Sequence, residues 1–479
     1  MNLSVIRYIL CQVMKIEGAL LLLPLLVSII YNDGCTLWFA VVAAAVLVVG
    51  SLGTIRKPKD STIYLKEGCV ATALSWIVLS IFGALPFFLS GSIPDITNAL
   101  FETVSGFTTT GASILNEVES LPASILFWRS FTHWIGGMGV LVFLLAVIPM
   151  SGGSNINLMR AESPGPSVSK LVPKIKTTAR VLYLIYLALT VLEVILLLAG
   201  GMPVFDSLTL SFGTAGTGGF GIKNDSFASY TPYVQWVAGI FMMLFGINFN
   251  FYYFLLLRQF SKAFSMEEVR KYVIIVIAAV TVIFLNIIHM YENAFTALTH
   301  AFFQVTSLMS STGFASADFD LWPTTSKFVL IILMIVGACA GSTGGGVKVS
   351  RFIVLFKSIR KEFSSYIHPR IVNKINMDKR PVEHEVVRSI NVYLITFLAV
   401  LITSIFLISF DGFDLTTSFT AVLATLNNIG PGLAAVGPTC NYSIFGIFSK
   451  YVLIFDMLAG RLELYPMLLL FYPALWRRR

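Results

Sequence analysis

Four short segments of this 479-residue chain consist mainly of small or polar residues and end in glycine. In chain order they are Thr109-Thr110-Gly111, Thr217-Gly218-Gly219, Ser311-Thr312-Gly313 and Asn428-Ile429-Gly430. The aligned glycines lie 108, 94 and 117 residues apart. Loops without large side chains can turn their backbone carbonyl oxygens toward one axis, and four of them would form a ring that replaces the water shell of a monovalent cation. The predicted chemistry is therefore cation coordination by backbone oxygens.

The composition indicates where such a ring would lie. Hydrophobic residues make up 56% of the chain and charged residues 12%, whereas a soluble domain carries roughly 25% charged residues. Apolar stretches of around 20 residues recur along the whole length, and each can cross the ~30 Å hydrocarbon core of a bilayer. The composition excludes a soluble monomer, a disordered tail and a disulfide-rich secreted module, and it predicts an all-α polytopic membrane protein.

Hydropathy and helix-breaking residues predict ten spans. They fall near 8–30, 36–53, 68–90, 124–150, 180–201, 233–257, 271–291, 327–357, 388–410 and 444–472. Four shorter apolar helices, too short to cross the bilayer, lead into the glycine loops, at 96–106, 204–214, 294–309 and 413–427. The order span, short helix, polar loop, span thus occurs four times, after two N-terminal helices.

This repetition predicts four helix–pore loop–helix repeats around a pseudo-fourfold pore. The predicted divisions are 1–67 for the two N-terminal helices, then 68–150, 180–257, 271–357 and 388–479 for the repeats, joined by cytoplasmic loops 151–179, 258–270 and 358–387. Close helix packing is the other common use of glycine in membranes. It would explain any one loop, but it explains poorly why four occur at matching positions.

Lysine and arginine indicate the orientation. Of the 33 basic residues, 26 lie in segments 54–67, 151–180, 258–271, 347–388 and 473–479. The segments that carry the glycine loops hold only Lys223, against eleven Asp or Glu. The positive-inside rule assigns the first set to the cytoplasm, so the loops enter from outside and the acids would attract cations there. The net charge of +8 is thus a topology signal, and no nucleic-acid partner is expected.

A run of glycines interrupts the predicted span 327–357. Residues 337–346 hold five glycines, and each costs a helix roughly 1 kcal/mol relative to alanine, so an unbroken helix is not expected. The run lacks the GK[ST] ending of a phosphate-binding loop, so nucleotide binding there is excluded. A packing kink and a functional loop both remain open.

Arg461 lies inside the last predicted span, where a charge is costly and indicates a functional site. A structural ion pair with Asp456 or Glu463 and extension toward the cytoplasmic face are the alternatives. Glu463 is only two residues away and would point elsewhere on a helix.

Several motifs together resemble the Trk/Ktr/HKT potassium-transporter superfamily over essentially the whole chain. The matching stretches are 107–113 and 131–139 in the first repeat, Gly216-Thr217-Gly218-Gly219-Phe220 in the second, Ser311-Thr312-Gly313-Phe314 in the third, and Asn427-Asn428-Ile429-Gly430-Pro431-Gly432 and 460–466 in the fourth. The length and the two extra N-terminal helices make the chain most similar to the bacterial TrkH branch. His133 departs from the pattern, because many relatives have glutamine there.

The resemblance implies potassium uptake across the bacterial inner membrane through a filter formed by the twelve loop residues. It also implies a homodimer and a cytoplasmic nucleotide-binding partner of the TrkA/KtrA type. In the family the stretch that matches 337–346 obstructs the pore below the filter, which makes Gly341, Gly344, Gly345 and Gly346 gate residues with Arg461 as their partner. Glycine at all four aligned positions favours potassium over sodium.

Two other functions stay open at this point. A symporter that couples potassium to sodium or protons would need acids at membrane depth, and the main candidates are Glu193, Asp456 and Glu463. An intramembrane enzyme would need a catalytic pair, which the sequence does not supply at matching positions.

Five scattered cysteines and five dispersed histidines predict no disulfide framework, metal site or cofactor. The basic loop 358–387 would contact lipid headgroups, dock a partner or simply be solvated.

Overall fold

The computed structural model describes residues 1–58, 63–137, 175–368 and 374–476. This part of the chain is helical except for loops and one antiparallel pair of two-residue strands, β1 (Asn376–Met377) and β2 (Arg380–Pro381). The prediction of an all-α membrane fold is confirmed. The end of the expected span 124–150 and most of the expected loop 151–179 lie outside the described residues.

Six apolar helical stretches of the described chain are long enough to cross a membrane. The first three are Leu3–Tyr31, which joins α1 (Leu3–Leu20) and α2 (Leu22–Tyr31), then α3 (Thr36–Thr54) and α4 (Leu65–Leu89). The fourth is Arg180–Ala199, which lies within α9 (Ile175–Ala199). The last two are Glu267–Met290, which begins with α14 (Glu267–Ile287), and His384–Asp411, which begins with α18 (His384–Ile408). Their large apolar side chains are exposed on the outer faces, as lipid contact requires.

Four short helices form the interior. They are α5 (Ile96–Phe107), α10 (Val204–Gly216), α15 (Ala294–Met309) and α19 (Leu415–Leu426). The last two turns of each are completely buried. Asp95 and Asp414 cap two of them, because their carboxylates accept the N–H groups of Asn98 and Thr417. After each short helix and its loop comes a further helix, namely α6 (Ala123–Gly137), α11 (Pro232–Phe245), α16 (Thr324–Val336) and α20 (Ile447–Arg461).

Three expected spans are interrupted. The break in 327–357 lies at the glycine run, as expected, whereas the breaks in 233–257 and 444–472 correct the hydropathy prediction. The span 233–257 bends by 89° between α11 and α12 (Phe249–Leu256). There the Gly246 carbonyl accepts the Cys339 N–H at 3.0 Å, and the Phe249 N–H donates to the Gly341 carbonyl at 3.0 Å. The backbone at this bend is therefore satisfied by a distant loop instead of by the next helical turn.

The other two interruptions follow from glycine and from left-handed backbone. The span 327–357 divides into α16 and α17 (Val349–Ile367), with the glycine run between them. The span 444–472 divides at Glu463 and Leu464, whose φ angles are positive, into α20 and α21 (Tyr465–Leu470), and α22 (Pro473–Trp476) follows. The expected loops are also partly helical, because α13 (Phe260–Ser265) lies in one and α17 extends into another.

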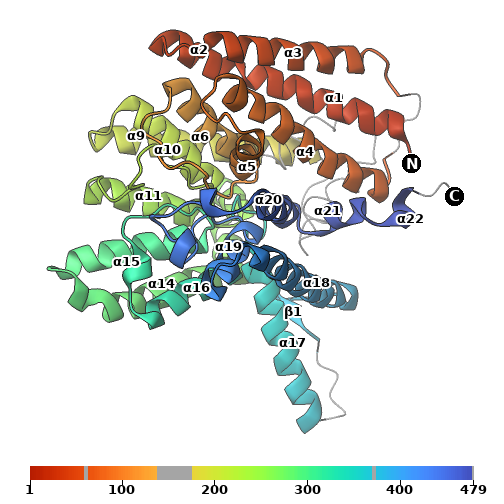
Figure 1. Ribbon diagram of the computed structural model, residues 1–479. Coiled ribbons are helices and arrows are strands. Elements are labelled where there is room, and N and C mark those ends of the chain that lie inside the picture. Colours follow the sequence, from red (N-terminus) through yellow and green to blue (C-terminus); the bar gives the residue numbers. More distant parts are fainter. Residues whose placement is uncertain (59–62, 138–174, 369–373, 477–479) are drawn as a thin grey trace.

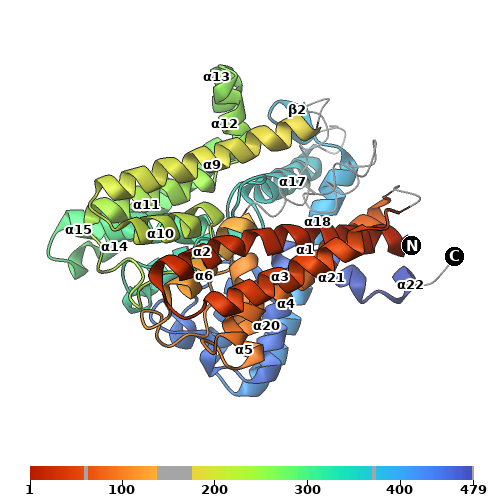
Figure 2. The same cartoon turned by 90° about the horizontal axis from the view of Figure 1, so that it is seen from above.

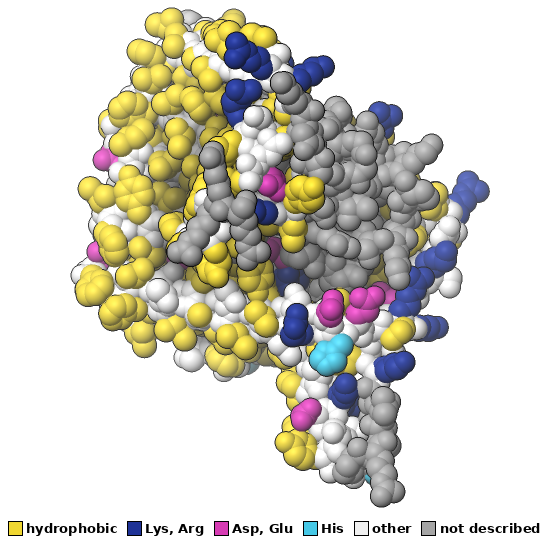
Figure 3. All heavy atoms as spheres, turned by 90° about the vertical axis from the view of Figure 1, so that its right-hand side faces the viewer, with side chains coloured by type: hydrophobic (Ala, Val, Ile, Leu, Met, Phe, Trp, Pro, Cys, Tyr) yellow, Lys and Arg dark blue, Asp and Glu magenta, His cyan; other side chains and the backbone are white. Residues whose placement is uncertain are grey.

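The helices α1, α2 and α3 form a layer at one edge of the molecule, and α17 projects from the body on the other side (Figure 1). Seen from above, α12 and α13 also project (Figure 2). Both termini lie at the same end in these two views. Lys and Arg side chains are spread over this end of the molecule, next to a wide apolar surface (Figure 3). It is the end that the charge pattern assigns to the cytoplasm.

The turn between α2 and α3 is fastened to the start of α6 by Asp33. Its carboxylate accepts the Ser124 N–H at 2.8 Å and the Cys35 N–H at 3.1 Å, and it also accepts the Ser28 hydroxyl. Burial of the carboxyl opposes its ionisation, but the hydrogen bonds from Ser124, Ser28 and Cys35 outweigh this and lower the pKa of Asp33 from its ordinary value. Asp33 therefore joins the N-terminal layer to the first repeat in its ionised form.

Asp33→Ala is expected to destabilise the protein by about 1–3 kcal/mol, because three donors lose a charged acceptor. Thermal unfolding in detergent measures this, with the exposed Glu117→Ala as the control. Since the pKa of Asp33 is lower in the folded state, the stability difference between wild type and Asp33→Ala should be full at neutral pH and shrink below about pH 4. Equal melting temperatures for wild type and Asp33→Ala would contradict this role.

Candidate functional site: four glycine loops around one pocket

The four loops that follow the short helices share one backbone conformation. The first residue of each is left-handed, with φ between 54° and 61°, and the glycine in third position has φ between 77° and 94°. The N–H of the second residue donates to the carbonyl five residues earlier, at 2.8–2.9 Å in all four loops. These bonds cap the helices, as a Schellman motif does. The four segments thus share the same φ angles and the same capping hydrogen bond.

The loops also meet each other in a closed cycle. A Cβ atom added to Gly111 would lie 2.1 Å from the carbonyl oxygen of Gly218 in the next loop. The corresponding distances are 2.0 Å from Gly219 to Thr312 O, 1.9 Å from Gly313 to Ile429 O, and 2.7 Å from Gly430 to Thr110 O. Each glycine therefore faces the second-position carbonyl of the following loop, and the fourth loop returns to the first. No side chain fits at these contacts.

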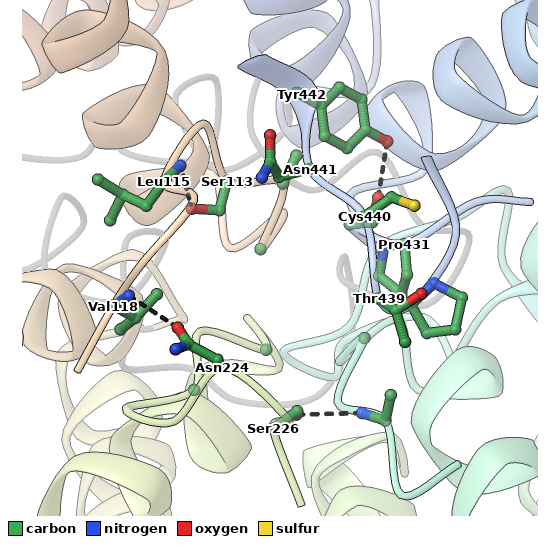
Figure 4. A pocket seen from close by; sticks show the side chains of 18 of the residues that line it. Ser113, Leu115, Val118, Asn224, Ser226, Pro431, Thr439, Cys440, Asn441 and Tyr442 are labelled. Carbon is green, nitrogen blue, oxygen red and sulfur yellow. Dashed lines mark hydrogen bonds between the residues drawn. The ribbon is translucent and has the colours of Figure 1, made fainter. Parts of the chain in front are cut away.

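A second set of contacts joins the chain just outside the glycines. The Val118 N–H donates to Asn224 Oδ1 at 2.8 Å, and the Ala315 N–H donates to Ser226 Oγ at 3.2 Å (Figure 4). The cycle is completed by Ala434 N–H to Asp320 Oδ2 at 3.2 Å and by Tyr442 N–H to the Ser113 carbonyl at 2.8 Å. Neighbouring repeats are thus hydrogen-bonded in the same order in which their glycines meet.

All four aligned glycines line one pocket of about 200 Å³ (Figure 4). The pocket wall carries amide, hydroxyl and backbone groups, together with the bases Arg129 and Lys223. Glu117 and Glu119 are exposed on the surrounding surface, and Glu119 accepts the Asn224 N–H at 3.0 Å. Any attraction of cations by these acids would therefore act around the pocket and not at its wall.

The glycine run between α16 and α17 lies against the opposite side of the loops. A Cβ on Gly344 would be 2.6 Å from Ser310 O, and one on Gly345 would be 2.3 Å from Asn427 O. The Gly345 N–H donates to Ser311 Oγ, and Lys348 Nζ donates to the Gly344 carbonyl. Since these partners precede the glycines that line the pocket, the run packs beneath the third and fourth loops. Gly341 and Gly346 have positive φ within the same run.

Arg461 joins this run to the first repeat. Its guanidinium donates to the Thr343 carbonyl at 2.9 Å and to the Gly136 carbonyl at 2.7 Å. The structural pairs considered from the sequence are formed with other residues, because Glu463 pairs with Arg351 and Asp456 accepts the Ser404 hydroxyl at 2.7 Å. The expected contact between Arg461 and the segment 337–346 is present.

Glu268 holds this region together, and sequence reasoning missed it. One oxygen of its buried carboxylate accepts the Ala340 N–H at 2.7 Å and the Ser350 N–H at 3.1 Å, so it joins the glycine run to the start of α17. The only signal was an acid at the very start of an apolar span, which is also a common helix-capping position. The Arg351–Glu463 ion pair was also missed, because its members are far apart in the chain.

The fold and this ring of loops define a polytopic α-helical membrane transport protein. A family model described as TrkH, cation transport protein, matches residues 37–478, and the chain belongs to that family. The chain is a transporter and not an enzyme, as expected.

Named relatives cover almost the whole chain. The chain is 37% identical over 468 residues to the Trk system potassium uptake protein TrkH of Salmonella typhimurium, covering 95% of this chain and 96% of that one. It is 32% identical over 464 residues to the Trk system potassium uptake protein TrkG of Escherichia coli, covering 95% and 94%. The crystal structure of the potassium transporter TrkH from Vibrio parahaemolyticus superposes with a TM-score of 0.89, at 30% identity and full coverage of both chains. The resemblance stated from the motifs is confirmed.

Cys440 provides a direct test of the pocket, because it is exposed at the pocket wall while Cys11, Cys35, Cys69 and Cys339 are buried. A membrane-impermeant maleimide applied to the outer face of intact cells should label Cys440 alone. Mass spectrometry of the labelled protein measures this, with Cys440→Ser as the control. Labelling only after the membrane is opened would place the pocket on the cytoplasmic side and contradict the assigned orientation.

Proposed function

We propose that this protein takes up potassium across the bacterial inner membrane through a gated, channel-like pore. The observation that carries the proposal is the closed cycle in which each glycine meets the carbonyl of the next loop. Its relatives are named as potassium uptake proteins, and one named potassium transporter shares its fold. Potassium is the transported ion in this proposal, and no cofactor is needed.

The proposed filter consists of the twelve loop residues. They are Thr109, Thr110, Gly111, Thr217, Gly218, Gly219, Ser311, Thr312, Gly313, Asn428, Ile429 and Gly430. Their carbonyl oxygens replace the hydration shell of a potassium ion, and the cycle of contacts fixes how far apart these oxygens lie. The short helices direct their C-terminal ends to the same place, where their dipoles favour a cation. Support comes from the shared backbone conformation and from the pocket on which all four glycines open.

The proposed gate consists of Gly341, Gly344, Gly345, Gly346 and Arg461. The glycine run lies beneath two of the loops, and Arg461 holds it through the Thr343 carbonyl. A guanidinium at this depth also repels a permeating cation, so the closed state is obstructed both sterically and electrostatically. Opening requires the run to move, and α17, which begins directly after it, would transmit that movement.

The proposal includes a homodimer and a cytoplasmic nucleotide-binding subunit of the TrkA/KtrA type, as the family resemblance implies. The basic segment 358–387 would contact that subunit or lipid headgroups.

A proton- or sodium-coupled symporter is the alternative function. The proposed pore is favoured because Asp456 and Glu463 are bonded to Ser404 and Arg351, and not to the loops. A coupled symporter would have to use Glu193, the third candidate acid, which is buried on α9.

Gly111→Ser is expected to lower the ratio of potassium to sodium flux by about tenfold, equivalent to ~1.4 kcal/mol in relative ion stabilisation. The added side chain would overlap the Gly218 carbonyl and turn it away. Uptake of radioactive rubidium against competing sodium in proteoliposomes measures this ratio. Gly91→Ser is a matched control, because Gly91 has a similar φ of 75° and open space around it. A wild type that does not discriminate, or a serine variant that discriminates as well, would contradict the filter.

Arg461→Ala is expected to raise basal rubidium flux several-fold and to leave the ion ratio unchanged, because it releases the glycine run without touching the filter. Lys450→Met is the control, since Lys450 lies on the same helix and its ammonium donates to Asn98 at 2.8 Å, away from the run. If a well-folded Arg461→Ala protein conducts no faster than wild type, the run is a packing device and not a gate.

A further inference from the structure

Phe220, the residue directly after Gly219, is held by two side chains of α6 in the neighbouring repeat. The Arg129 guanidinium lies 3.7 Å from the centre of the Phe220 ring, and the His133 imidazole lies 4.2 Å from it, measured between ring centres. All three side chains are almost completely buried. Side chains of the first repeat therefore pack against the second glycine loop and hold it in place.

His133 also bonds to the backbone of both repeats. The Phe220 N–H donates to His133 Nε2 at 3.1 Å, and His133 Nδ1 lies 2.8 Å from the Gly106 carbonyl at the end of α5. An amide N–H is always a donor, so Nε2 must be the acceptor and Nδ1 must carry the proton. The hydrogen-bond partners thus assign a single neutral tautomer, which links the last turn of one short helix to the loop of the next repeat.

This bond fixes a carbonyl that belongs to the proposed filter. Residues 219 and 220 share one planar, trans peptide unit, in which the N–H and the C=O point in opposite directions. Since the Phe220 N–H is directed at His133, the Gly219 carbonyl is directed away from α6. A loss of this hydrogen bond would allow the whole peptide unit to rotate, and the carbonyl would rotate with it.

Arg129, one turn before His133 on α6, also bonds to both repeats. Its Nε forms a buried ion pair with Glu102 at 2.6 Å, and its NH1 donates to the Gly221 carbonyl at 2.7 Å. Glu102 in turn accepts the Ile114 N–H at 3.0 Å, just after the first glycine loop. The Gly221 carbonyl of the second repeat and the Ile114 N–H of the first repeat are thus bonded to the same Arg129–Glu102 ion pair.

We infer that His133 is a positioning residue that sets ion selectivity by fixing the Gly219–Phe220 peptide, with Arg129 holding the Gly221 carbonyl two residues further along. The inference rests on the proposed function, because it concerns the selectivity of the same ring. His133 does not touch the ion. It acts through the orientation of one carbonyl, and a side chain that makes the same two hydrogen bonds should replace it.

The test compares His133→Leu with His133→Gln in proteoliposomes. Leucine removes both hydrogen bonds, so the ratio of rubidium to sodium uptake should fall about tenfold. The glutamine amide can donate to Gly106 and accept from Phe220, so this variant should keep the wild-type ratio within about twofold. Ser130→Ala on the same helix is the matched control, because its buried hydroxyl has no hydrogen-bond partner among the described residues.

The outcomes separate this inference from the proposed function. A wild type that does not select rubidium over sodium overturns the proposed filter itself. A selective wild type whose ratio is unchanged in His133→Leu overturns the role of His133 alone, as does a glutamine variant that fails to restore the ratio. If His133→Leu does not assemble, His133→Ala removes the same hydrogen bonds with less bulk, and the same ratio decides the question.

Discussion

Each aligned glycine contacts the carbonyl of the following loop, and this contact determines how the four loops and their short helices are arranged. Gly111, Gly219 and Gly313 leave about 2 Å for a Cβ atom, and real Cβ atoms do not approach carbonyl oxygens so closely. The four loops must therefore share one conformation, and the short helices that end in them must meet at one place. Their complete burial and the cycle of hydrogen bonds outside the glycines follow from this requirement.

The four loops share one backbone conformation, but the side chains that support the second, third and fourth loops differ. The second loop is fixed through the Phe220 N–H by His133, whereas the Gly430 carbonyl of the fourth accepts the Tyr442 hydroxyl at 2.7 Å. In the third, the Ser307 hydroxyl donates to the Phe314 carbonyl at 2.6 Å. The glycine run that follows α16 likewise contacts the third and fourth loops. A single chain can thus build a nearly symmetric ring of glycine loops and still place an asymmetric glycine run beneath it.

The sequence predicted the features that depend on local composition. Apolar length predicted a helical membrane protein, which is confirmed, and the spacing of Gly111, Gly219, Gly313 and Gly430 predicted four segments that share one backbone conformation. The bend after α11 was not predictable, because its backbone bonds to Cys339 and Gly341 far along the chain. Long-range polar contacts were missed for the same reason: Glu268 holds residues 340 and 350, and Arg351 pairs with Glu463. His133 was noted only as a departure from the family pattern, and its two partners became visible in three dimensions.

In the proposed filter, the four glycine loops coordinate one dehydrated monovalent cation on a common axis. Anomalous diffraction from crystals grown in rubidium or thallium salts shows where such a cation binds. A peak is expected on the axis of the ring, within coordination distance of carbonyl oxygens from all four loops. Such a peak should weaken when sodium replaces the heavier ion. Strong anomalous density that contacts only one or two loops, or none within the ring at saturating salt, would rule out coordination by the ring.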